Sequence, residues 1–151
     1  MEKTRFLLPR QSYQSKINMS NGFGLDPIPG LSRISPDTAQ LLVLNGPGAQ
    51  RKFRLNQMRT LIGRDDPPHI KVDIDLTDCE LGTPPAVSRR HAEIQWVEGE
   101  LEIVDLCSSN GTFVDGKELS PIGPNQPSVP VILKIGTKLK LGNLEFEVTN
   151  R

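Results

Sequence analysis

From Ala39 onward, short runs of alternating apolar and polar residues are separated by turn residues, and no run has the period of a convincing helix. Because each short strand of a sandwich or barrel buries one face, this pattern is typical of an all-β domain of one of these two kinds. Strands are predicted over 41–44, 52–55 and 60–63, with a turn over 45–48 between the first two.

Near the C-terminus, a two-residue turn at Gly142-Asn143 organises the pattern into a hairpin. With that turn, Leu139 lies opposite Phe146 on one face of the strand pair. On the other face, Lys140 lies opposite Glu145, so that opposite charges are paired. The hairpin is therefore predicted to supply core residues and a charged surface, and to carry no binding site.

Two further turns follow the same logic. A turn at Glu98-Gly99 sets Trp96 opposite Leu101 and leaves the intervening side chains, Glu102 among them, facing water. Asp115-Gly116 predicts a type I′ hairpin, because this pair tolerates the positive φ that both turn positions need.

Residues 1–38 differ from the rest of the chain. They are rich in Ser, Asn, Gln, Gly and Pro and show no sustained apolar period. Segments of this composition bury too little apolar surface to offset the entropy of ordering them. We therefore predict a flexible N-terminal arm over 1–38 and one folded domain over 39–150.

Composition excludes several classes of protein. The 18 basic residues balance 18 acidic ones, so no overall field attracts nucleic acid or an anionic membrane. No apolar run approaches the roughly 18 to 20 residues of a membrane span, and no secretory signal is present, so a cytoplasmic protein is expected. Cys79 and Cys107 are expected as reduced thiols, and since His69 and His91 lie far apart, neither a metal nor another cofactor is expected.

Three polar clusters combine cations with small hydrogen-bond donors, at 63–64, 88–91 and 108–112. A phosphate monoester carries roughly 1.5 to 2 negative charges at pH 7 and several strong acceptor oxygens. Arginine matches it with a planar fork of donors, and hydroxyl or backbone N–H groups can satisfy the remaining oxygens. The clusters therefore indicate a phosphate site assembled from loops.

In this order, Gly63-Arg64, Ser88-Arg89-Arg90-His91, Ser109-Asn110-Gly111-Thr112 and Leu139-Lys140-Leu141-Gly142 resemble the motif set of forkhead-associated (FHA) domains. The resemblance covers 41–148. It implies a two-sheet antiparallel β-sandwich that binds Thr-phosphorylated proteins downstream of a Ser/Thr kinase, as a signalling adaptor without catalytic activity. The phosphopeptide-binding residues that it implies are Arg64, Ser88, Arg89, Ser109 and Asn110.

The resemblance also implies residues that support the site, namely Gly63, His91, Gly111 and Thr112. Arg90 is predicted to be a solvated rim charge, since neighbouring residues on a strand point to opposite faces. The loop over 77–87 is longer than in many family members and is expected to border the peptide groove.

Three alternatives remain open. Ser88 or Ser108 could act as a nucleophile with His91 and Asp105, although Ser88 and His91 would lie on opposite faces of an extended strand. Partners could instead bind a phosphate-independent side surface of the sandwich. Finally, phosphorylation of Thr4 could let the arm fold back and occupy the site.

Overall fold

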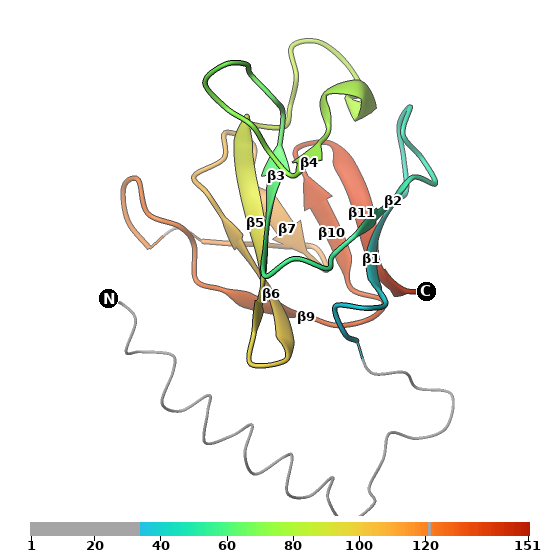
Figure 1. Cartoon of the computed structure of the whole chain (residues 1–151). Coiled ribbons are helices and arrows are strands. Elements are labelled where there is room, and N and C mark those ends of the chain that lie inside the picture. Colours follow the sequence, from blue (N-terminus) through green and yellow to red (C-terminus); the bar gives the residue numbers. More distant parts are fainter. Residues whose placement is uncertain (1–33, 121) are drawn as a thin grey trace, which may run out of the picture. The chain divides into compact units, whose positions relative to one another are not determined.

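The computed structural model describes residues 34–120 and 122–151. Within them the regular secondary structure consists of strands and one 3₁₀ turn, η1 (Thr77–Cys79). One sheet has the order β2 (Lys52–Arg54), β1 (Ala39–Val43), β11 (Leu144–Asn150), β10 (Lys138–Leu141), β7 (Thr112–Val114), β8 (Lys117–Glu118). The other has the order β4 (Ile74–Asp75), β3 (Arg59–Gly63), β5 (Arg90–Val97), β6 (Glu100–Asp105), β9 (Val131–Leu133). Figure 1 shows the strands in two layers, so the predicted sandwich is confirmed.

The core lies between the two layers because the longer strands turn their apolar residues inward. In β1 the burial alternates along the strand, and Leu41 is fully buried. Phe146 from the same sheet and Ile94 and Ile103 from the other are equally inaccessible. Burial of each such side chain contributes about 1.5 to 3 kcal/mol, which gives the loops a rigid base.

The predicted hairpins form in the expected register. Leu139 pairs with Phe146 and Lys140 with Glu145 across β10 and β11. Trp96 likewise pairs with Leu101 across β5 and β6. Both positions of the turn between β7 and β8 have positive φ, 48° at Asp115 and 85° at Gly116, as a type I′ turn requires.

Two features differ from the sequence expectation. β3 and β4 pair in parallel, so the second sheet is mixed rather than purely antiparallel. Glu102, expected to face water, is only 1% exposed. The expectation treated β5 and β6 as an isolated hairpin, whereas β6 is an inner strand with Ile132 of β9 opposite Glu102 on its other side.

The loops that follow β3 and β4 lie at one end of the sandwich, at the top of Figure 1. The arm predicted over 1–38 lies outside the described residues except for 34–38, where the Ser35 carbonyl accepts hydrogen bonds from the amides of Thr38 and Ala39. The domain boundary at residue 38 stays a prediction. In the described ranges, no helix is long and apolar enough to cross a membrane.

Candidate functional site

The three polar clusters predicted from the sequence meet around one hollow of about 370 Å³. One side is formed by the loop after β3, another by the approach to β5, and a third by the loop between β6 and β7. Its lining residues are Arg64, Ile70, Ser88, Arg89, Arg90 and Ser109. The hollow therefore gathers three arginines and two serine residues from segments far apart in the sequence.

Gly63 lets two of these segments approach closely. A Cβ at this position would overlap the carbonyl group of Arg89 and lie 2.9 Å from the Ser88 carbonyl oxygen. The register between β3 and β5 shifts at the same place, so that Gly63 pairs with Arg90 although Ile62 pairs with Ala92. A residue without a side chain is thus required where Arg64 is brought beside Ser88.

Arg64 is fixed by its own backbone and by its side chain. Its amide donates to the Arg89 carbonyl at 3.0 Å, and its Nε donates to the Val87 carbonyl at 2.6 Å. Within the described part of the chain, no residue accepts a hydrogen bond from its two terminal nitrogens. The two terminal nitrogens of the guanidinium are therefore available as hydrogen-bond donors at the hollow.

His91 connects the second cluster to the third. Its Nδ1 accepts a hydrogen bond from the Ser88 amide at 3.0 Å, which places the ring proton on Nε2, 2.9 Å from the Gly111 carbonyl. Burial lowers the pKa of this imidazole below its usual value, against the smaller raising effects of the Gly111 hydrogen bond, Asp105 and Glu80. His91 is therefore a neutral brace between two loops.

The third cluster is held by hydrogen bonds at both ends. The Ser109 amide donates to Ser88 Oγ at 3.0 Å, which joins the two serine-bearing loops directly. Gly111 adopts φ of +90°, and a Cβ there would lie 2.8 Å from Glu118 Oε2. Asn110, at the exposed tip, donates from Nδ2 to the Ala86 carbonyl at 2.9 Å.

Asp105 organises this loop, a role that the sequence analysis missed. Its Oδ1 accepts hydrogen bonds from Ser108 Oγ at 2.5 Å and from Thr112 Oγ1 at 2.6 Å. Its Oδ2 accepts from the Ser108 amide at 3.0 Å. The sequence does carry a signal for this role, namely an Asp three residues before a Ser where a strand passes into a loop. Carboxylates at such positions accept hydrogen bonds from nearby backbone N–H groups.

Arg89 and Arg90 correct one part of the sequence reasoning. Both line the hollow, because Arg89 precedes the first residue of β5 and the alternation of a strand does not apply to it. Arg89 Nη1 donates to Asp66 Oδ2 at 2.7 Å, in an exposed ion pair. Arg90 is exposed, as expected.

The side chains suggested for catalysis are engaged elsewhere. Both ring nitrogens of His91 bind backbone groups, and neither contacts the Ser88 hydroxyl. Ser108 Oγ bonds directly to Asp105 without an intervening imidazole. Cys79 and Cys107 are free thiols, and among the described residues no group of three metal-ligating side chains gathers.

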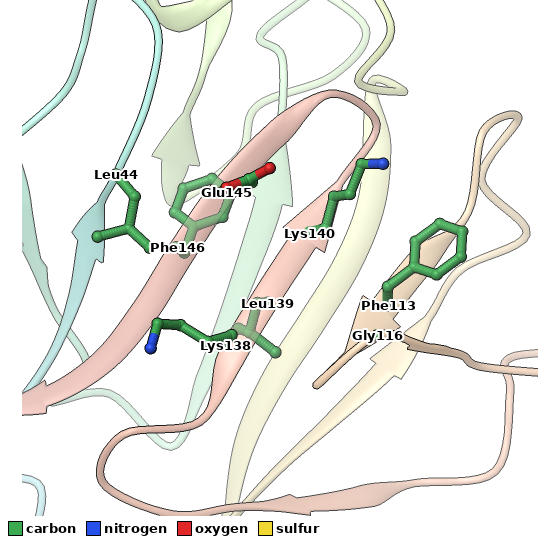
Figure 2. A pocket seen from close by; sticks show the side chains of 8 residues that line it. All are labelled: Leu44, Phe113, Gly116, Lys138, Leu139, Lys140, Glu145 and Phe146. Carbon is green, nitrogen blue, oxygen red and sulfur yellow. The ribbon is translucent and has the colours of Figure 1, made fainter.

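A second hollow, of about 450 Å³, lies on the six-stranded sheet and shares no lining residue with the first. Figure 2 shows Lys138 and Lys140 on one strand, with Glu145 and Phe113 on either side. Lys140 Nζ stands 5.4 Å from the centre of the Phe113 ring. The surface is thus partly apolar and carries charges of both signs.

The chain is similar to known proteins in both sequence and fold. A model of the FHA domain matches residues 60–142, which is more than half of the chain. The chain belongs to the FHA family. The match includes every residue of the hollow and both loop braces, His91 and Asp105.

Relatives and solved FHA structures are similar over most of the chain. An oxoglutarate dehydrogenase inhibitor of Corynebacterium efficiens is 34% identical over 117 residues, which cover 78% of this chain and 69% of the relative. A kinase-interacting FHA domain, from the kinase associated protein phosphatase of Arabidopsis, superposes with a TM-score of 0.58 at 28% identity, covering 75% of this chain and 93% of that one. An FHA structure described for phosphothreonine-dependent interactions gives 0.53 at 29% identity, covering 74% and 95%.

Proposed function

We propose that this FHA domain is an adaptor that binds Thr-phosphorylated proteins through the hollow around Arg64. As an FHA domain, the chain is a phosphothreonine-dependent binding module. The observation that supports the site is the convergence of Arg64, Ser88 and Ser109 on one hollow, with Arg89 and Arg90 on its wall. Because a phosphate dianion needs charge and many donors at once, this arrangement suits it better than a neutral ligand.

In this proposal Arg64 and the Ser88 hydroxyl bind the phosphate, Arg89 contacts phosphate or peptide, and Ser109 lines the pocket beside the phosphothreonine. Asn110 binds the peptide backbone through its Oδ1 and the second N–H of its Nδ2, while the first N–H stays on the Ala86 carbonyl. The domain performs no catalysis. A Ser/Thr kinase acts upstream to create the phosphothreonine.

Arg64→Ala tests this function. A charge-assisted hydrogen bond is worth about 1.5 to 3 kcal/mol, and removing one partner of a desolvated pair costs about 2 to 5. Titration calorimetry with a phosphothreonine peptide selected from an oriented library is therefore expected to give no measurable binding for the variant. The same peptide without phosphate is expected not to bind the wild-type protein.

Arg54→Ala is the matched control, because Arg54 is an exposed arginine on the short strand β2 and lines neither hollow. It is expected to keep wild-type affinity. A folded Arg64→Ala protein that binds as tightly as the wild type contradicts the assignment.

A second candidate function is phosphate-independent binding of a protein partner through a side surface of the sandwich. The hollow on the six-stranded sheet favours it (Figure 2). Competition separates the two. Excess phosphothreonine peptide should displace a partner bound at Arg64, whereas a partner on the sheet should stay bound and should be lost on Phe113→Ala.

A further inference from the structure

The long loop before Ser88 carries a buried carboxylate. The Glu80 side chain is only 9% exposed. Its Oε1 accepts a hydrogen bond from the Ala86 amide at 3.2 Å, and its Oε2 accepts from the Val87 amide at 2.9 Å. One carboxylate thus binds two consecutive backbone N–H groups.

This arrangement fixes the backbone just before the phosphate site. In an extended strand, consecutive N–H groups point to opposite sides, so one carboxylate cannot reach both. Glu80 therefore requires a bent conformation at Ala86-Val87, in which both N–H groups face inward. The bend is also packed from outside, because a Cβ on Gly142 would lie 2.7 Å from the Ala86 carbonyl oxygen.

The carbonyl groups of the same two residues bind the side chains proposed to hold the ligand. Asn110 Nδ2 donates to the Ala86 carbonyl at 2.9 Å, and Arg64 Nε donates to the Val87 carbonyl at 2.6 Å. Glu80 Oε2 is also 3.9 Å from Arg64 Nε. All four hydrogen-bonding groups of this dipeptide are consequently used, two by Glu80 and two by the site.

We infer that Glu80 is a positioning residue for phosphopeptide binding, which acts through the Ala86-Val87 backbone to set the Arg64 guanidinium and the Asn110 amide. The inference rests on the proposed function. Glu80 itself does not touch the phosphate. It holds the two carbonyl groups in the places from which Arg64 and Asn110 are oriented toward the ligand.

The negative charge of Glu80 separates a positioning effect from a purely electrostatic one. The phosphate is an anion, so removal of a nearby negative charge would by itself strengthen binding. Loss of a positioning residue has the opposite effect, because the donors lose their fixed orientation. Glu80→Gln keeps the size of the side chain and removes the charge, and its single amide oxygen can replace only one of the two acceptors.

The experiment measures binding of the library-selected phosphothreonine peptide to full-length wild-type, Glu80→Gln and Glu80→Ala proteins. Glu98→Gln is the matched control, since Glu98 lies exposed in the β5–β6 turn. We expect Glu80→Gln to bind the peptide about tenfold more weakly than the wild type, because it loses one of the two hydrogen bonds of the carboxylate. Glu80→Ala loses both and is expected to bind at least as weakly as Glu80→Gln. Glu98→Gln is expected to bind like the wild type.

A second readout reports position directly. In ¹⁵N-resolved NMR spectra of the free protein, the Arg64 Nε–H and the Asn110 side-chain amide are expected to shift in Glu80→Gln and to stay in place in Glu98→Gln. Unchanged or stronger binding by a folded Glu80→Gln protein overturns the inference while leaving the proposed function intact. If the wild type binds no phosphothreonine peptide of the library, the proposed function fails and the inference with it.

Discussion

Single residues decide whether the loops of this domain can meet. Gly63 is required by a close approach of two backbones, and His91 by a hydrogen bond on each side of its ring. Neither residue is exposed enough to be a main ligand contact, and both determine where Ser88 lies. At this scale the site depends on residues that hold it in shape as much as on those that face the hollow.

His91 predicts how stability depends on pH. Burial lowers its pKa in the folded protein, so between the unfolded value near 6.5 and the folded value the unfolded chain binds more protons. The free energy of unfolding should therefore fall as pH drops below about 6.5. Urea unfolding between pH 7.5 and 5 measures this profile.

Two variants isolate the contribution of His91. His91→Gln is expected to be less stable at pH 7.5 and to lose less stability on acidification. His69→Gln, at an exposed position, is expected to keep the wild-type profile. If the free energy of unfolding depends on pH in the same way in His91→Gln and in the wild type, the buried His91 does not have a lowered pKa.

Elements differ in how far the sequence predicts them. The registers of the β5–β6 and β10–β11 hairpins follow from alternation and turn residues, because their partners are adjacent in sequence. The order of the four motifs also identifies the site loops. The role of Glu80 could not be predicted, since it depends on backbone amides that the bend at Ala86-Val87 brings beside it. Asp105 did leave a local signal, because the Ser108 amide that it binds lies three residues later. Local alternation misled in two places. It separated Arg90 from the hollow that Arg89 lines, although the strand begins only at Arg90, and it exposed Glu102, although β6 has a further neighbour.

The loop between β6 and β7 gives a prediction at this scale. Asp105→Asn replaces one of the two acceptor oxygens by a donor that faces the Ser108 amide or the hydroxyls of Ser108 and Thr112. An unsatisfied buried group costs about 1 to 3 kcal/mol, and stability to urea should fall by that amount. Peptide affinity should fall as well, because Ser109 and Asn110 lie on this loop.

Asp78→Asn provides the comparison, since it makes the same change at an exposed residue of η1. It is expected to alter stability by less than about 0.5 kcal/mol. Equal stability of the two variants would show that the Asp105 hydrogen bonds do not hold the loop.

At the scale of the whole chain, a phosphorylated N-terminal arm could block the binding site of its own domain, which we call self-occlusion. Thr4 lies outside the described residues, and a tethered phosphothreonine can reach an effective concentration in the millimolar range. If phosphorylated Thr4 occupies the Arg64 hollow, the Thr4-phosphorylated chain should bind a phosphothreonine peptide more weakly than a shortened chain does. Calorimetry on both proteins measures the difference.

The shortened chain should begin at Ile34, because Ile34 packs against the core and the Ser35 carbonyl binds the amides of Thr38 and Ala39. The control is a full chain with Thr4→Ala that is treated with the same kinase. It keeps the arm but carries no phosphate at residue 4. Equal affinity of the phosphorylated full chain and the shortened chain rules out self-occlusion through Thr4.

The ends of the two sheets have a consequence for self-association. β2 and β8 end one sheet and β4 and β9 the other, and each is only two or three residues long. The exposed positions of β2 and β8 are Lys52, Arg54, Lys117 and Glu118. Short, charged edge strands give a foreign strand little template on which to pair. The six-stranded sheet thereby resists edge-to-edge pairing through both the length and the charge of its edges. The β9 edge of the other sheet, where Ile132 is 44% exposed, has only its short length against such pairing.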